Sequence, residues 1–325
     1  MWDITAIGDI AVDLIMVNPA GEPRPGTETL VEDARVALGG STALLAAAAA
    51  RLGLRVRLVG KVGDDLFGQF LLGALTQAGV DTTLVRVVPE RSAITVALSK
   101  SDDRALVTYA GTIATLAASD IPSAALEGTR RLHIGSYFLQ RTLQPDCAAI
   151  LQRAQARGIA TSLDPGDDPD DTWDAELARV LPHVDCFLPN EREATRIAGM
   201  ESPAAALAAL ARRVPSVAIK LGVEGAVARV GGAEHRVSAY PVRAIDTTGA
   251  GDAFDAGFLW GVVRGLPPRE CLRLGAATGA LATTWPGGHD ARLSPALVRD
   301  LIEATDGPGS FPLALQTEVN DGPDT

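Results

Sequence analysis

Lysine is scarce in this chain, which has only Lys61, Lys100 and Lys220 among its 325 residues. Aspartate and glutamate outnumber lysine and arginine by 40 to 29, which gives a formal net charge of -11. Such a chain lacks the basic surface that nucleic acids and anionic membranes attract. A phosphate ligand would therefore be met by local amides and a few cations, so each lysine is a candidate for such a contact.

Cysteine and histidine are also rare, and no two of them have the spacing of metal ligands. Cys147, Cys186 and Cys271 are odd in number and far apart, which gives no disulfide framework. The N-terminus begins with a strand pattern and has no basic region followed by an apolar run, so we expect no secretory signal. The most apolar stretch, residues 43–50, is too short to span a bilayer. These absences together predict a reduced, cytoplasmic protein.

The clearest chemical signal is the stretch of residues 246–258, which reads Asp-Thr-Thr-Gly-Ala-Gly-Asp-Ala-Phe-Asp-Ala-Gly-Phe. Gly249, Ala250 and Gly251 are small enough for a tight turn whose successive N–H groups point at one spot. Apolar residues then recur every four positions, as they do on one face of a helix. The sequence therefore predicts a turn that opens a helix, and a helix N-terminus attracts anions.

Asp252 falls in the first turn of that predicted helix, beside the anion pocket. A loop built only to hold phosphate would avoid a carboxylate, because like charges repel. The arrangement suits a carboxylate that takes a proton from a hydroxyl while the amides hold the phosphoryl group that the hydroxyl attacks. On the residues alone, a carboxylate that merely complements the helix dipole explains Asp252 about equally well.

The run Asp-Thr-Thr-Gly-Ala-Gly-Asp-x-Phe-x-x-Gly resembles the C-terminal signature of the ribokinase-like (PfkB) carbohydrate kinases. Matching motifs are spaced over about residues 3 to 300. The resemblance implies transfer of the γ-phosphoryl group of ATP to a hydroxyl of a small sugar or sugar-like substrate, with Mg²⁺ as cofactor. It also implies that Asp252 is the catalytic base and that Gly249, Ala250 and Gly251 form the anion hole.

Strand and helix patterns alternate along the chain, which predicts an α/β fold with a mostly parallel central sheet and helices on both faces. Two excursions, residues 13–37 and 89–110, interrupt the alternation; the second reads as a hairpin with Asp102-Asp103 at its turn. In the resembling family such excursions combine into a small β-sheet lid over the sugar, and lids often pair into homodimers. The predicted core is then 1–12, 38–88 and 111–304, followed by a disordered tail at 305–325.

The acceptor side of the site is predicted from carboxylates near the end of the first strand. Asp9 and Asp13 lie where α/β sheets place their ligands and could accept hydrogen bonds from a polyol, although solvated loop acids explain them equally well. The resemblance adds Gly39 and Gly40 as residues that help to hold substrate. Leu44 departs from the family, which commonly has an Asn whose amide touches the sugar, because Leu neither donates nor accepts a hydrogen bond.

The nucleotide side is predicted from two strand ends. Asn190 and Glu193 have the spacing of a plain helix cap, and the resemblance implies that they organise Mg²⁺, its waters and the phosphates. Gly222 and Gly225 allow close backbone approach by a nucleotide. Lys220 stands where the family has a small polar residue, and its ammonium could still meet a phosphate.

A monovalent cation site is implied by the resemblance alone. Asp246 and Thr248 match positions that bind such a cation in several relatives, which makes K⁺ a further expected cofactor.

Two other functions stay open at this point. A nucleoside kinase of the same fold suits Leu44 and the apolar pair Tyr137-Phe138. A non-catalytic nucleotide-sensing module is disfavoured by Asp252, because a sensor has no need of a base. A dinucleotide-binding dehydrogenase is excluded, since Phe254 stands where helix packing needs a small residue, and no P-loop motif occurs.

Overall fold

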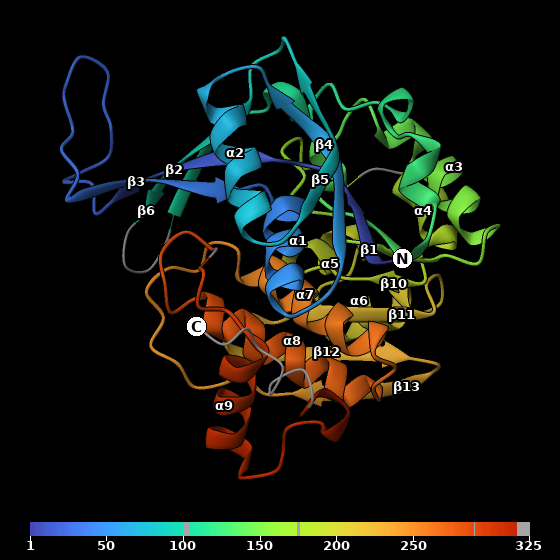
Figure 1. Cartoon of the computed structure of the whole chain (residues 1–325). Helices are drawn as coiled ribbons and strands as arrows, with labels where there is room; N and C mark the ends of the chain where they lie inside the picture. Colours follow the sequence, from blue (N-terminus) through green and yellow to red (C-terminus); the bar gives the residue numbers. More distant parts are fainter. Residues whose placement is uncertain (100–103, 174–175, 289, 317–325) are drawn as a thin grey trace.

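The structure is a computed structural model that describes residues 1–99, 104–173, 176–288 and 290–316. Within these residues the backbone forms one sheet of nine strands and a separate sheet of four (Figure 1). In order across the larger sheet the strands are β13 (Ala233–Val237), β12 (Ala226–Val230), β11 (Ser216–Lys220), β10 (Cys186–Phe187), β9 (Ala160–Leu163), β8 (Thr129–Ile134), β1 (Trp2–Ile7), β4 (Val56–Gly63) and β5 (Asp81–Val88).

The larger sheet is parallel from β11 to β5, and only β12 and β13 run antiparallel to their neighbours. Alternate residues of a strand point to opposite faces, and β1 shows this clearly. Ile4 and Ala6 enter one hydrophobic core, whereas Ile7 enters the other. A sheet buried on both faces explains why the strands read as nearly continuous apolar runs.

Helices cover both faces of this sheet, as predicted. The first core is covered by α1 (Ser41–Arg51), α2 (Leu66–Gln77), α7 (Ala250–Val263), α8 (Pro268–Ala282) and α9 (Pro295–Asp306). The second is covered by α3 (Gln144–Gln155), α4 (Leu177–Val180), α5 (Glu191–Ala198) and α6 (Pro203–Leu210). Every helix in the described ranges is too short or too polar to cross a bilayer.

The smaller sheet is the predicted lid, and it projects at the left of Figure 1. Its order is β3 (Asp33–Gly39), β2 (Ala11–Val17), β6 (Ala93–Ser99) and β7 (Arg104–Tyr109). β6 and β7 pair antiparallel as the hairpin pattern predicted, and the predicted turn at Asp102-Asp103 lies outside the described residues. The α/β fold with a separate lid sheet is therefore confirmed.

Two boundaries differ from the sequence-based expectation. The first lid excursion was expected to begin at residue 13, but β1 ends at Ile7 and Ala11 already opens lid strand β2. The tail was expected to be disordered from residue 305, yet Phe311 and Leu315 are fully buried, and Phe311 contacts the ring of Trp260. Two buried apolar side chains among Gly and Pro are enough to fix residues 305–316; residues 317–325 are not described.

The parallel strands bring distant polar residues to one edge of the sheet. Asp9 follows β1, Asp164 follows β9, Asn190 follows β10 and Lys220 ends β11. The carboxyl ends of parallel strands meet at the same edge, which is where open α/β sheets bind ligands.

Candidate active site

The predicted turn before α7 is present and depends on glycine. Gly249 has a positive φ of 69°, and a Cβ atom there would lie 2.8 Å from Gly288 Cα and 3.0 Å from the Gly288 carbonyl oxygen. Only glycine allows this close approach of two backbones without strain. The turn therefore presents the N-terminal amides of α7 to the edge of the sheet.

Asp252 lies in the first turn of α7, partly exposed, as the sequence predicted. Its pKa is raised well above that of an ordinary aspartate, first by burial and then by the nearby negative charge of Asp164. Lys220 and a hydrogen bond with the Ser41 side chain act in the opposite direction. A raised pKa brings a carboxylate closer to the range in which a general base works best.

Asp9, a predicted substrate contact, caps the helix α1 in the structure. Its carboxylate accepts hydrogen bonds from the Ser41 amide (2.8 Å), the Thr42 amide (2.9 Å) and the Thr42 hydroxyl (2.6 Å). These are the first residues of α1, so Asp9 satisfies amides that the helix leaves unpaired. The structure thus gives Asp9 a capping role through both of its oxygens.

Asp13 and Gly39 lie side by side, on neighbouring lid strands. Asp13 is buried on β2, and a Cβ atom at Gly39 of β3 would overlap its carboxylate, so glycine at that position makes room for the acid. Leu44 on α1 is also buried, and its Cδ1 atom comes within 3.2 Å of where a Gly249 Cβ would be. The side of the turn that faces α1 is therefore lined by an apolar side chain.

A pocket of about 480 Å³ lies on the other side of the turn. Three of the four predicted nucleotide contacts, Lys220, Gly222 and Gly225, line this pocket, whereas Asn190 does not. Its remaining lining is mostly apolar and comes from the turn after β11, the loop after β13, α7 and α8: Val223, Ala239, Tyr240, Pro241, Val242, Ala244, Thr247, Ala250, Gly251, Phe254, Ala276, Gly279, Ala280 and Thr283. The turn thus separates this pocket from the lid.

Asn190 and Glu193 form a complete capping box at the start of α5. The Asn190 amide and side-chain NH₂ donate to Glu193 at 2.8 and 2.6 Å, and the Glu193 amide donates to Asn190 Oδ1 at 2.9 Å. Glu193 is buried, and burial followed by repulsion from Asp164 raises its pKa to about 7. A buried carboxylate of this kind suits a nearby cation, which would favour its charged form.

The site geometry can now be compared with known proteins. The sequence model of the "pfkB family carbohydrate kinase" matches residues 1–294. The chain belongs to this family. It is 33% identical over 307 residues to the fructokinase of Klebsiella pneumoniae, covering 89% of this chain and 95% of that protein. It is 28% identical over 281 residues to the nucleoside kinase of Methanothermobacter thermautotrophicus, covering 86% of this chain and 88% of that protein.

A solved structure agrees with the fold of this pfkB-family chain. Arabidopsis thaliana ribokinase complexed with ribose and ATP has a TM-score of 0.79 at 24% identity, and the match covers 92% of this chain and 98% of that one. The protein is an ATP-dependent phosphotransferase with an alcohol group as acceptor, of the family that acts on sugars or nucleosides. The predicted family and enzyme class are therefore confirmed.

The pfkB-family site also contains two carboxylates that the sequence analysis missed. The Lys220 ammonium donates to Asp164 Oδ2 at 2.7 Å and to the two Asp255 oxygens at 3.1 and 3.2 Å. Asp164 follows β9, and Asp255 lies one turn after Asp252 on α7. The position of Asp164 at the carboxyl end of a parallel strand was the available signal.

At the predicted monovalent cation site, Asp246 links two loops by hydrogen bonds. Asp246 accepts hydrogen bonds from the Thr248 amide at 2.8 Å and the Gly287 amide at 3.0 Å, so it ties the turn before α7 to the Gly287 loop. Each carboxylate oxygen keeps a lone pair for a cation. Among the described residues, no three Asp, Glu, His or Cys side chains gather as a metal site, so carbonyl oxygens would have to complete such a shell.

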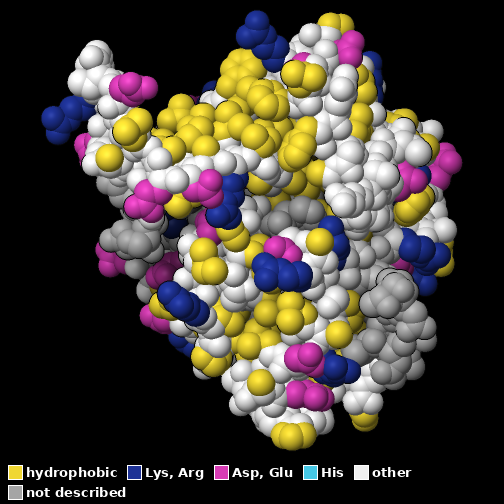
Figure 2. Space-filling view, turned by 60° about the vertical axis from the view of Figure 1, so that its left-hand side comes forward, with side chains coloured by type: hydrophobic (Ala, Val, Ile, Leu, Met, Phe, Trp, Pro, Cys, Tyr) yellow, Lys and Arg dark blue, Asp and Glu magenta, His cyan; other side chains and the backbone are white. Residues whose placement is uncertain are grey.

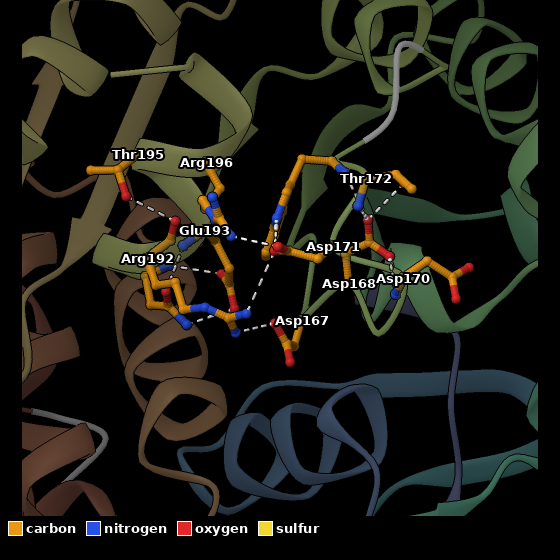
Figure 3. A network of polar contacts seen from close by, with 11 residues as sticks. Asp167, Asp168, Asp170, Asp171, Thr172, Arg192, Glu193, Thr195 and Arg196 are labelled. Carbon is orange, nitrogen blue, oxygen red and sulfur yellow. Dashed lines mark hydrogen bonds and ion pairs between the residues drawn. The ribbon is translucent and has the colours of Figure 1, made fainter. Parts of the chain in front are cut away.

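Beside the capping box an exposed network ties α5 to the loop after β9 (Figure 3). Arg192 pairs with Asp167 and contacts Asp171 at 3.9 Å, and Arg196 pairs with Asp171 at 2.5 Å. Asp168 holds that loop by accepting from the amides of residues 170, 172 and 173. We call Arg192, Arg196, Asp167 and Asp171 the surface clasp.

Proposed function

We propose that this kinase transfers the γ-phosphoryl group of ATP to a hydroxyl of a small sugar or sugar-like substrate, with Asp252 as the base. One observation carries the proposal. Asp252 lies in the first turn of α7, directly after Gly251, which helps to line the pocket. Its side chain also has a hydrogen bond with Ser41, the first residue of α1, which follows lid strand β3. A base is needed at the boundary between donor and acceptor.

In this mechanism the Asp252 carboxylate accepts the proton of the attacking hydroxyl, which is worth about 10²–10⁴-fold for a positioned general base. The amides of Gly249, Ala250 and Gly251 donate to the charge that develops on the transferred group, and one such donor is typically worth about 10²–10³-fold. Most of the remaining rate enhancement comes from holding the reactants in line. The lid, with Asp13, Gly39 and Gly40 beside its inner end, excludes water from the acceptor.

The proposed donor site is the pocket lined by Gly222 and Gly225, with Asn190 and Glu193 near the phosphates. Glu193 would hold Mg²⁺ through water, because both of its oxygens already accept hydrogen bonds from Asn190. When bound, Mg²⁺ neutralises phosphate charge. Asp246 and Thr248 would hold K⁺ outside the reacting centre, where it would steady the turn before α7.

A nucleoside is the second candidate acceptor, and Leu44 is the observation that favours it. An apolar side chain against the turn can contact a base or another weakly polar group, whereas it offers a sugar hydroxyl no hydrogen bond. Asp13 is then the acid that would accept hydrogen bonds from a ribose diol. The relatives of this chain include both a fructokinase and a nucleoside kinase.

A homodimer through the lid is a further part of the proposal. Val36, Leu106, Val107 and Tyr109 on the lid strands are each more than half exposed. Figure 2, in which the side that bears the lid comes forward, shows hydrophobic side chains gathered on the upper part of that face. Sedimentation velocity tests this: a dimer that Val107→Lys dissociates supports the lid interface, and a monomer at all concentrations contradicts it.

The test of the reaction is ADP release from Mg·ATP across a panel of ketoses, aldoses, deoxy-sugar acids and nucleosides. Reactions without an acceptor measure background ATP hydrolysis. One acceptor class should raise ADP release by orders of magnitude over background and yield a phosphate monoester of that acceptor. ADP release that no acceptor on the panel increases would contradict the proposed substrate class.

A further inference from the structure

Lys220 stands at the centre of an unusual concentration of negative charge. Its ammonium lies within 3.2 Å of both Asp164 and Asp255, and Asp252 and Glu193 both feel its charge. The side chain of Lys220 is 12% exposed, those of Asp164 and Asp255 8% and 1%. Two acids thus contact the Lys220 ammonium, and two more lie near enough to interact with its charge.

The charge of Lys220 is already neutralised by carboxylates of the protein itself. Burial alone would lower the pKa of Lys220, but Asp164 and Asp255 outweigh burial and raise it above that of an ordinary lysine. A buried carboxylate pair facing one ammonium is balanced only while the ammonium stays. A phosphate would therefore compete with two carboxylates for an ammonium that they hold at hydrogen-bonding distance.

The three residues come from three separate elements. Lys220 ends β11, Asp164 follows β9, and Asp255 is on the second turn of α7, three residues after Asp252. The Lys220 ammonium also lies 3.6 Å from where a Gly251 Cβ would be, directly beside the anion-hole turn. An ion pair from the sheet to Asp255 thus holds α7 one turn after Asp252, the proposed base.

We propose that Lys220 is a positioning residue. By binding both Asp164 and Asp255, it fixes the position of the first turn of α7, with Asp252 and the anion-hole amides, relative to the sheet. Phosphate binding is left to the backbone amides and to the other residues that line the nucleotide pocket. This inference rests on the proposed function and replaces the expectation that Lys220 contacts a phosphate.

Three variants test it: Lys220→Met, Asp255→Asn, and the two together. Lys220→Met leaves two buried carboxylates facing each other without a cation, so its Tm should fall by about 5–10 °C. Its kcat should fall about 10²-fold, because a reacting group is misplaced. KM for ATP should change by less than about threefold, and the ADP-induced rise in Tm should change by less than about 1 °C, which is on the order of assay error. The double variant should recover at least half of both losses, because one carboxylate has lost its charge.

Lys61→Met is the matched control. Lys61 is a buried lysine on β4, away from the α7 turn. Its ammonium pairs with Asp120 at 2.6 Å and donates to the Thr115 carbonyl. It should lose a similar amount of Tm with kcat within about twofold of wild type, since its pair holds no reacting group. A Lys61→Met variant that lost kcat as Lys220→Met does would show general destabilisation and overturn the positioning role.

Other outcomes also decide the matter. If Lys220→Met raises KM for ATP and abolishes the ADP-induced rise in Tm, Lys220 contacts the nucleotide and the proposal is wrong. If the double variant is no better than Lys220→Met, the two side chains are not coupled and the proposal is again wrong. The Tm measurements need no acceptor, so the coupling of Lys220 to Asp255 can be measured even if the wild-type protein shows no turnover. An absence of turnover would contradict the proposed function alone.

Discussion

The two ends of the proposed active site differ in the chemical groups that form them. The transfer end consists of the α7 turn, Glu193 and the Lys220 cluster, where backbone amides and buried charges lie close together. The acceptor end consists of Asp13, Gly39 and Leu44, with one carboxylate on a lid strand and one apolar side chain on α1. A second carboxylate that the sequence assigned to the acceptor end, Asp9, caps α1.

This difference separates reaction chemistry from acceptor choice. Backbone amides and buried ion pairs treat every acceptor alike, because they act on the phosphoryl group and on the proton. Acceptor choice depends on a few side chains, and a change of one polar group there alters relative affinities. Variants at the transfer end should lower the rate for all acceptors by one factor, and variants at the acceptor end should change the ratio between acceptors.

The largest effect at the transfer end is expected from Gly249→Ala. Its Cβ atom would lie 2.8 Å from Gly288 Cα in a backbone conformation that alanine disfavours, so the turn must shift. Loss of well-placed amides should lower kcat by about 10²–10³-fold for every acceptor.

Gly265→Ala is the control for that variant. Gly265 ends α7 with a similar φ of 71°, but a Cβ atom there meets nothing within 4 Å. It should lose stability and keep kcat within about twofold, on the scale of a surface change. Equal losses of kcat in the two variants, measured by ADP release, would show that the amides of the α7 turn do not form an anion hole.

Glu193 should make stability depend on pH. Its folded pKa of about 7 lies above the ordinary 4.5, so the folded protein binds this proton more tightly than the unfolded chain. That contribution is complete below pH 4.5 and is lost as pH rises through 7, by up to about 3 kcal/mol.

Glu193→Gln removes this contribution and keeps an acceptor for the Asn190 amide. Urea unfolding without Mg²⁺ should show wild type losing stability relative to Glu193→Gln between pH 5.5 and pH 8. Glu201→Gln, an exposed change two residues past the end of α5's cap, serves as control. A wild-type difference from Glu193→Gln that stays constant with pH would contradict the raised pKa.

At the acceptor end, Leu44→Asn should alter selectivity more than rate. An amide against the turn offers a sugar hydroxyl a partner that leucine lacks, which should shift kcat/KM toward sugars over nucleosides by about tenfold. Leu44→Met keeps an apolar side chain of similar volume and should leave the ratio unchanged. Competition assays with paired acceptors measure it, and an unchanged ratio in Leu44→Asn would show that residue 44 does not contact the acceptor.

The smallest effect is expected in the surface clasp. Arg192 and Asp167 are each more than half exposed, so their ion pair is screened by water and salt. Arg192→Ala should cost no more than about 1 kcal/mol of unfolding free energy, less at high salt, with kcat within about twofold. A loss as large as that of Lys220→Met would mean that the loop after β9 positions the site through the clasp.

Local patterns predicted much of this molecule. The small-residue turn, the helix after it and the strand–helix alternation were all readable, because each depends on residues near one another in the sequence. The Asn190–Glu193 pair was readable as a cap for the same reason. The positions of Asp13 beside Gly39 and of Leu44 beside Gly249 needed the fold.

The Lys220 cluster was not predictable from one sequence. Asp164 and Asp255 are 91 residues apart in sequence number. The order of β9 and β11 in the sheet brings Asp164 to the Lys220 ammonium, and the packing of α7 brings Asp255 to it. The burial of Phe311 was missed for a similar reason, since its partner Trp260 lies on α7. Contacts between distant elements carry no local periodicity.

Whether Asp252 is the base is decided by kcat of Asp252→Asn on the best acceptor, with ADP affinity measured on the same samples. Asparagine keeps the shape of the side chain and removes the base. We expect kcat to fall by about 10²–10⁴-fold, ADP affinity to stay within about threefold of wild type, and the exposed control Asp300→Asn to lose no activity. A variant that turned over as fast as wild type would show that Asp252 is not the base.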